Sequence, residues 1–168
     1  MDWSDPLELC EPDRGDGPAM MQIARETGVL SVNSAYYYAL MARRFQDTCM
    51  VARCKGALCA YTTGFFLPRQ PNTLFVWQVG VATAAQGRGI GRKVLTALIE
   101  KARPAFIEAT IVPGNTASIR LFQSAARHFE AAWAFSNTPF FTRSDMGPDE
   151  TPEHLMRIGP IHLQRQNM

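Results

Sequence analysis

A glycine-rich segment between an apolar strand and an amphipathic helix constrains this chain most. Residues 74–81 form a nearly continuous apolar run, which is typical of a central strand covered on both faces. Residues 86–92 read QGRGIGR, and apolar residues then recur at helical spacing until Pro104. In such a unit the main-chain N–H groups of the turn lie at the positive end of the helix dipole, where a diphosphate binds. The segment therefore predicts an anion site.

The glycine spacing excludes two common phosphate loops. A dinucleotide fingerprint starting at Gly87 requires glycine at the position held by Arg92. A Walker loop requires Gly-Lys followed by Ser or Thr, whereas residues 91–94 read GRKV. A tight turn that uses glycine only for positive φ remains an alternative at this point.

The rest of the chain alternates between helical and strand patterns. Before the central strand we expect a short strand at residues 7–9, a helix at 17–26, a helix capped by Asn33 or Ser34, and strands at 48–53 and 58–67 joined by Lys55-Gly56. After the central strand and its helix we expect a strand at 106–112 and a helix opened by Asn115. Apolar runs at 131–135 and 155–161 could close the sheet. This order predicts a mixed α+β sandwich and not a strict βαβ repeat.

Composition narrows the function classes. The chain has 168 residues and a net charge of +2, which fits one domain over residues 5–160 with short tails at 1–4 and 161–168 and disfavours nucleic acid as the main partner. The acidic start and the lack of an apolar run of roughly 20 residues predict a cytoplasmic protein that binds no membrane. The four cysteines lack C-x-x-C spacing and are expected to be free thiols. The scattered histidines predict no metal site.

The motif Gln86-x-x-Gly89-x-Gly91 resembles the coenzyme A pyrophosphate loop of the GNAT N-acetyltransferases, and Asn115-x-x-Ser118-x-x-Leu121-Phe122 resembles their last helix. The resemblance implies a mostly antiparallel sheet of six to seven strands, flanked by about four helices and splayed between its two central strands, with acetyl-CoA as co-substrate. The cofactor residues that it implies are Val79, Gly80 and Val81 for pantetheine, Gln86, Gly87, Arg88, Gly89, Ile90, Gly91 and Arg92 for the pyrophosphate, and Asn115 and Ser118 beside the pantetheine arm.

Three further segments, at residues 28–38, 71–79 and 155–160, are similar to the diaminobutyrate acetyltransferase family of ectoine biosynthesis. This resemblance covers roughly residues 6–160. It implies transfer of an acetyl group from acetyl-CoA to the γ-amine (N4) of L-2,4-diaminobutyrate, the precursor of a compatible solute, by a homodimer.

An amine of this kind must lose a proton before it attacks. With a pKa of about 10.4, the neutral form is disfavoured at pH 7 by about 4.6 kcal/mol. Glu108, which shares a strand face with Thr110, is the expected base or amine anchor, and a carboxylate that only accepts hydrogen bonds at a sheet end is the alternative. A main-chain N–H near Val79 or Gly80, where a bulge fits, is expected to stabilise the oxyanion.

The departing thiolate needs a proton, and Phe122 stands where many family members have a tyrosine. Tyr36 or Tyr38 is the expected replacement, although both could be amphipathic core tyrosines. The expected acceptor residues are Ser31, where most relatives have aspartate, Asn33, Trp77, Gln78, Thr110 and Glu153.

Several roles stay open. Trp77 could be a pocket wall or a core residue, and Glu153 could pair with the substrate ammonium or be an exposed loop acid. Arg43, Arg44 and Arg157 could each hold the substrate carboxylate. A different small amine or a protein lysine could be the acceptor, and the absent tyrosine at Phe122 would also suit a non-catalytic acetyl-CoA-binding module.

Overall fold

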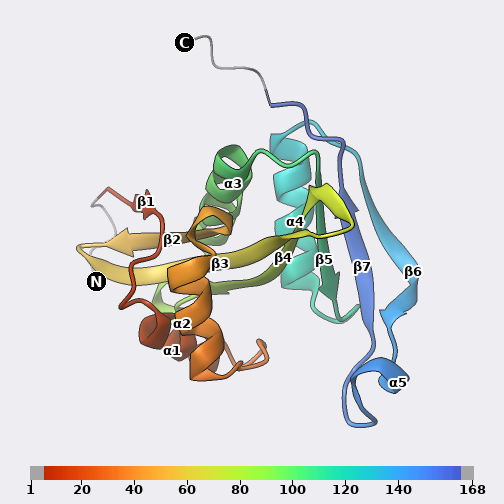
Figure 1. The fold of residues 1–168 in the computed structure, drawn as a ribbon, viewed down its shortest axis with the longest axis horizontal. Helices are drawn as coiled ribbons and strands as arrows, with labels where there is room; N and C mark the ends of the chain where they lie inside the picture. The colour runs from red at the N-terminus through yellow and green to blue at the C-terminus, as the bar shows by residue number, and fades with distance from the viewer. Residues whose placement is uncertain (1–5, 164–168) are drawn as a thin grey trace. The chain divides into compact units, whose positions relative to one another are not determined.

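The computed structural model describes residues 6–163, so the predicted tails lie outside the described residues except for 161–163. The chain forms a seven-stranded sheet in the order β1-β2-β3-β4-β5-β7-β6 (Figure 1). Strands β1 and β2, β2 and β3, β5 and β7, and β6 and β7 pair antiparallel, whereas β4 and β5 pair parallel. The mixed, mostly antiparallel α+β fold predicted from the sequence is confirmed.

The chain divides into two compact units. Unit 1 comprises residues 6–65 and 76–102, and unit 2 comprises residues 66–75 and 103–163. Strands β3 (Ala57–Leu67) and β4 (Gln70–Val81) each contribute to both units. The single domain expected over residues 5–160 stays a prediction, and the units are described separately.

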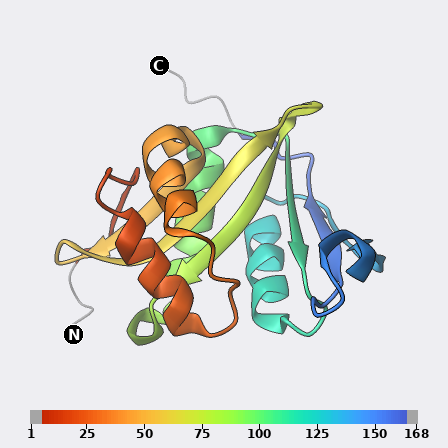
Figure 2. The same cartoon turned by 60° about the horizontal axis from the view of Figure 1, so that its bottom comes forward.

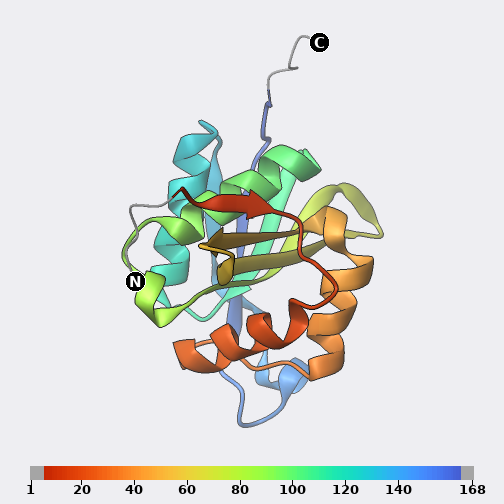
Figure 3. The same ribbon diagram turned by 90° about the vertical axis from the view of Figure 1, so that its left-hand side faces the viewer.

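In unit 1, helices cover both faces of the strands. Helices α1 (Gly17–Thr27) and α2 (Ala35–Arg44) lie on one face, and α3 (Ile90–Ala102) lies on the other (Figures 2 and 3). The Ser34 hydroxyl accepts from the Tyr37 amide and caps α2, which settles the predicted choice between Asn33 and Ser34. The buried core between the strands and the first two helices includes Met20, Ile23, Tyr38, Val51 and Tyr61.

Two residues with positive φ form the turn of the hairpin in unit 1. Strand β1 (Glu8–Cys10) pairs with β2 (Cys49–Cys54), and β2 turns into β3 at Lys55 and Gly56. These two residues have φ values of 52° and 76°, the pair of positive values that a type I′ turn requires. The predicted hairpin is confirmed, and short 3-10 helices at Gln46–Thr48 and Thr83–Ala85 complete the unit.

In unit 2, β5 (Phe106–Ile111) lies between the first half of β4 and β7 (Glu153–Ile158). Helix α4 (Thr116–His128) contacts β7 and buries Phe122, Ala125 and Ala126. The short helix α5 (Arg143–Met146) follows β6 (Trp133–Phe141).

The last two strands correct the predicted boundaries. The apolar run at 131–135 marks only the start of this strand, because β6 spans Trp133–Phe141 and has register shifts on both sides of Pro139. Proline lacks an N–H donor and is tolerated because β6 is the edge strand of the sheet. Within residues 6–163 no helix has both the length and the apolarity needed to cross a membrane. Cys10, Cys49, Cys54 and Cys59 are free thiols.

Candidate active site

The phosphate turn, residues 86–92, exposes main-chain donors at the start of α3. Gly87 and Gly89 have φ values of 74° and 71°, and a Cβ at either position would have no heavy atom within 4 Å. The amide of Lys93 donates to the carbonyl of Gly89 at 3.1 Å. The amides of Ile90, Gly91 and Arg92 precede it in the first turn, where a helix provides no acceptor of its own. The glycines are therefore needed for the backbone, and the amides of the turn have no acceptor within the helix.

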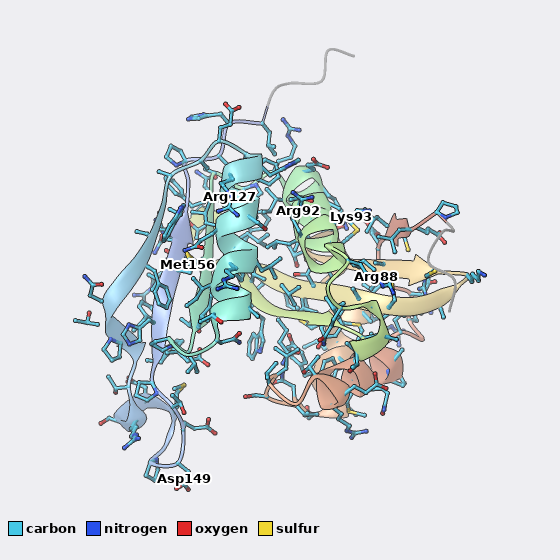
Figure 4. All side chains as sticks on the ribbon, turned by 180° about the vertical axis from the view of Figure 1, so that it is seen from behind. Arg88, Arg92, Lys93, Arg127, Asp149 and Met156 are labelled. Atoms are coloured by element: carbon cyan, nitrogen blue, oxygen red, sulfur yellow. The ribbon has the colours of Figure 1, made fainter. Side chains whose placement is uncertain are left out.

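Charge and anchoring complete this turn. Arg88, Arg92 and Lys93 extend from the turn and the first turn of α3, and all three are exposed (Figure 4). They add positive charge to that of the helix N-terminus. The Gln86 side chain points back to β4, because its Nε2 donates to the carbonyl of Val81 at 3.2 Å. Gln86 thus holds the shape of the turn, and the main-chain amides and the nearby positive charge favour an anion.

A buried amide lies on β4 in the same unit. Gln78 Oε1 accepts from the hydroxyls of Tyr61 at 2.9 Å and Tyr38 at 3.2 Å, and Gln78 Nε2 donates to the carbonyl of Ser31 at 2.6 Å. We call these four residues the Gln78 cluster. Burial, followed by the neighbouring Tyr38, raises the pKa of the Tyr61 hydroxyl well above its ordinary value. The Tyr61 hydroxyl therefore keeps its proton across the physiological pH range.

Trp77, next to this amide, is half exposed. Its side chain is 48% exposed although the apolar run predicted a strand covered on both faces, so that prediction is wrong at this position. The indole ring lies 5.1 Å from the Tyr37 ring and 5.8 Å from the Phe65 ring. Trp77 is exposed and the next residue, Gln78, is buried, as alternation along a strand requires, and each contacts a tyrosine of α2.

Gly80 is small for a steric reason. A Cβ on this residue would lie 2.9 Å from Cζ of Tyr61 and 3.1 Å from Cγ2 of Ile23. Glycine therefore lets the Tyr61 ring cross β4 and reach Gln78. Val79 is partly buried beside it, and the bulge expected near Gly80 stays a prediction.

The two predicted tyrosine acids occupy opposite environments. Tyr36 is 75% exposed, whereas Tyr38 is fully buried. The Tyr38 hydroxyl donates to Gln78 and accepts from the amide of Asn33 at 3.4 Å, so it is engaged on both sides. Asn33 Nδ2 is buried and has no hydrogen-bond partner among the residues that the structure describes.

Tyr37 contacts two of the predicted site residues, although the sequence did not indicate it. Its hydroxyl is hydrogen-bonded to Thr63 Oγ1 at 2.8 Å, and its ring contacts both Tyr38 and Trp77. Burial raises the pKa of this hydroxyl, which makes it a poor proton donor. The missed signal is that Tyr37 and Tyr61 occur in segments that bury one face, where a phenol needs a hydrogen-bond partner.

In unit 2, Glu108 is paired. Its Oε1 accepts from Arg157 Nη1, and the two residues are direct partners across the β5 and β7 ladder. The Arg157 guanidinium also lies over the Phe106 ring, 4.2 Å from its centroid. Arg157 is therefore already engaged by a carboxylate, while Arg43 and Arg44 are exposed on α2 of unit 1.

The remaining predicted residues of unit 2 lie on β5, β7 and the start of α4. Thr110 pairs with Leu155 across the ladder, and Glu153 is partly buried at the first position of β7. Asn115 caps α4 because its Oδ1 accepts from the amide of Ser118 at 3.1 Å. Phe122 is buried on α4 and offers no hydroxyl. No group of His, Cys, Asp and Glu side chains within residues 6–163 could hold a metal ion.

Comparison with known proteins identifies the family. Residues 18–126 match the model of the Acetyltransferase (GNAT) family. The chain is 37% identical to the L-2,4-diaminobutyric acid acetyltransferase of Shouchella clausii over 92% of this chain and 88% of that protein, and 40% identical to that of Streptomyces anulatus over 92% and 90%. The chain belongs to the GNAT acetyltransferases, in the L-2,4-diaminobutyric acid acetyltransferase family.

A solved structure supports this membership at the level of the fold. The diaminobutyrate acetyltransferase of Paenibacillus lautus, in complex with its substrate L-2,4-diaminobutyric acid and coenzyme A, superposes with a TM-score of 0.84. It is 35% identical, and the match covers 95% of this chain and 98% of the other. The GNAT architecture expected from the sequence is therefore confirmed over nearly the whole chain.

Proposed function

We propose that this GNAT acetyltransferase transfers the acetyl group of acetyl-CoA to the γ-amine of L-2,4-diaminobutyrate, a step of ectoine biosynthesis. The observation that carries the proposal is the match, over 95% of the chain, to a relative solved with that amino acid and coenzyme A. The relatives that match by sequence over about nine-tenths of the chain have the same activity in their names.

The phosphate turn fits the coenzyme. Positive φ at Gly87 and Gly89, together with open space where a Cβ would stand, lets a diphosphate approach the main chain. The amides of residues 87–92 would bind its oxygens, and Arg88 and Arg92 would neutralise its charge. Val79, Gly80 and Val81 of β4, with Asn115 and Ser118 of α4, keep their proposed role along the pantetheine arm.

The acceptor amine requires deprotonation and orientation. Glu108 remains the proposed base or amine anchor, and its pairing with Arg157 favours the anchor role because one carboxylate oxygen is already engaged. A main-chain N–H near Val79 or Gly80 would stabilise the negative charge that develops during transfer. Thr110, Glu153, Ser31, Asn33 and Trp77 keep their proposed contacts with the amino acid.

Tyr36 is the better of the two proposed acids. Its phenol is exposed and reaches solvent, whereas the Tyr38 hydroxyl is buried and doubly hydrogen-bonded. Tyr38 would have to break its hydrogen bond to Gln78, which uses the hydroxyl proton, before it gave up that proton to a thiolate. We therefore propose that Tyr36 protonates the leaving thiolate and that Tyr38 supports the acceptor side.

A direct assay tests the function. Purified protein with acetyl-CoA and L-2,4-diaminobutyrate should release free thiol, and mass spectrometry with NMR should place the acetyl group on N4. Ornithine, lysine, 2-aminobutyrate and a lysine peptide are the comparison acceptors. Release no faster than without enzyme would refute catalysis and favour the acetyl-CoA-binding module, while preference for the peptide would refute the small-molecule acceptor.

We also propose that the enzyme is a homodimer, as its family resemblance implies, and that it works in the cytoplasm without nucleic acid or membrane partners, as its charge and apolar pattern indicate. Light scattering coupled to size-exclusion chromatography measures the mass of the assembly in solution. A monomer at assay concentration, with full activity, would refute the dimer.

A further inference from the structure

We propose that Gln78 is a positioning residue of the acceptor site, which acts by holding the carbonyl of Ser31 and not by touching the substrate. This inference rests on the proposed function for its kinetic consequence. Its structural basis is the set of contacts in the Gln78 cluster.

The side-chain amide of Gln78 is almost fully used. Its oxygen accepts two tyrosine hydroxyls, at 2.9 Å from Tyr61 and 3.2 Å from Tyr38. Its nitrogen donates to Ser31 O at 2.6 Å. The orientation of the amide is determined by chemistry, because the Ser31 carbonyl can only accept and must face the nitrogen. A buried amide with three partners has little capacity left for a ligand.

The segment that Gln78 holds connects α1 to α2. Gly28, with φ 64°, ends α1, and Ser34 caps α2. Between them, Val29 is 74% exposed, Val32 is 46% exposed and Ser31 is exposed, whereas Leu30 is partly buried against the core of unit 1. Packing therefore holds the segment at Leu30, and the hydrogen bond from Gln78 ties the next residue, Ser31, to strand β4.

The same segment carries two groups assigned to the acceptor. These are Ser31 itself and Asn33, whose Nδ2 is a buried donor without a partner among the described residues. The main-chain amide of Asn33 donates to the Tyr38 hydroxyl, which in turn donates to Gln78. Movement of Ser31 would thus shift Asn33 relative to Trp77, the neighbour of Gln78 on β4. None of these hydrogen bonds involves the phosphate turn. The affinity for the coenzyme should therefore not depend on the Gln78 side chain.

The variant Gln78→Glu separates the two ends of the amide. A glutamate keeps an oxygen acceptor for both tyrosines but replaces the donor to Ser31 with a second acceptor. Tyr61→Phe is the matched control, because it removes one hydrogen bond to the oxygen and leaves the donor to Ser31 intact. At pH 8 we expect Gln78→Glu to raise the acceptor KM by about tenfold or more and Tyr61→Phe by less than about threefold, while the acetyl-CoA Kd changes by less than about twofold in both.

The pH profile distinguishes positioning from general loss of stability. Burial raises the pKa of a carboxyl, and in Gln78→Glu the introduced carboxyl, once protonated, regains an O–H donor toward Ser31. The kcat/KM of the variant, divided by that of the wild type at each pH, should therefore rise as the pH falls from 8.5 to 6. A constant ratio, or an acceptor KM equal to or below that of the wild type, would overturn the proposal.

Hydrogen exchange tests the structural half without any substrate. Amides of residues 29–33 should exchange faster in Gln78→Glu than in the wild type and should be unchanged in Tyr61→Phe. Unchanged exchange in both variants would overturn the positioning role even if the enzyme is active. If the wild type does not acetylate diaminobutyrate, the proposed function is refuted. Faster exchange in Gln78→Glu would still support the hydrogen bond from Gln78 as the group that holds residues 29–33. If Gln78→Glu does not fold by circular dichroism, Gln78→Met, which also lacks the donor, takes its place in the KM and exchange measurements.

Discussion

The phosphate turn and the Gln78 cluster belong to the same unit but are built from opposite kinds of polar group. The turn is exposed and glycine-rich, and its donors are main-chain amides with open space around Gly87 and Gly89. The cluster is buried and side-chain based, with a close contact at Gly80 and three hydrogen bonds on one amide. The turn should therefore be sensitive to added charge and to backbone change, whereas the cluster should be sensitive to added volume and to the loss of single polar atoms.

The largest effect is expected at the turn, from Gly89→Asp. The carboxylate would oppose the diphosphate with a repulsion of about 3 kcal/mol at 5 Å and an effective dielectric constant of 20, and φ of 71° adds strain. The acetyl-CoA Kd measured by calorimetry should rise by about 100-fold or more. Gly89→Asn is the control, because asparagine has the same shape, tolerates positive φ and carries no charge. Equal affinity of Gly89→Asp and the wild type for acetyl-CoA would show that the phosphate turn does not bind the diphosphate.

On the acceptor side, Trp77→Ala should act on the amino acid alone. Loss of the half-exposed ring removes roughly 1.5–3 kcal/mol of apolar contact, so the acceptor KM should rise by about 10- to 100-fold. Steady-state kinetics with a separate coenzyme titration measure both substrates. Trp77→Phe, which keeps an aromatic ring near Tyr37, should lose less. A rise in the coenzyme Kd as large as that in the acceptor KM would show that the two regions are not separate.

Volume at Gly80 tests the packing of the buried region. Gly80→Ala places a methyl group against the Tyr61 ring and should lower the free energy of unfolding by about 1–3 kcal/mol. Urea unfolding followed by circular dichroism provides the value. Gly15→Ala is the matched control, because a Cβ there would have no heavy atom within 4 Å. Equal stability of the two variants would contradict the close contact.

The smallest effect is a pH dependence confined to the buried region. Burial raises the pKa of the Cys49 thiol from 9.0 to about 12 and also raises that of the Tyr37 hydroxyl. Above pH 9 the unfolded chain loses the Cys49 proton while the folded chain keeps it. The contribution of these two groups to the free energy of unfolding should therefore be fully present below pH 8 and should fall above about pH 9, by at most about 1.4 kcal/mol per pH unit for each group.

Unfolding in urea at pH 8, 9 and 10 measures this slope, and Cys49→Ala should reduce it. The Cys49 thiol should also resist a disulfide reagent at pH 8 in the folded protein and react after unfolding. Rapid reaction in the folded state would contradict its burial.

The contrast also explains which parts of the molecule the sequence can predict. The turn is local: its glycines, the preceding apolar strand and the following helix are contiguous, so spacing alone excluded the other phosphate loops. The hairpin at Lys55 and Gly56 and the cap at Asn115 are local in the same way, and the structure shows all three.

The Gln78 cluster could not be predicted because its members are distant in the chain. Gln78 lies 47 residues from Ser31 and 40 from Tyr38, and no periodicity indicates which buried amide meets which hydroxyl. The exposure of Trp77 could not be predicted for the same reason: an apolar run predicts average burial, whereas the exposure of one side chain depends on which helices cover the strand. The extension of β6 beyond residue 135 was missed for a different reason: the residues after the apolar run include Pro139, which an edge strand tolerates and an interior strand excludes.

The central claim is that the main-chain amides of residues 87–92 hold the diphosphate of the coenzyme. Amide chemical shifts in ¹H–¹⁵N spectra, recorded with acetyl-CoA and with S-acetylpantetheine, which lacks the diphosphate, test it most directly. With acetyl-CoA but not with S-acetylpantetheine, chemical shifts should change at the amides of Gly87, Gly89, Ile90, Gly91 and Arg92. The amides of residues 79–81 should shift with both ligands. Shifts at the turn that are equal for the two ligands, or absent with acetyl-CoA, would contradict the account.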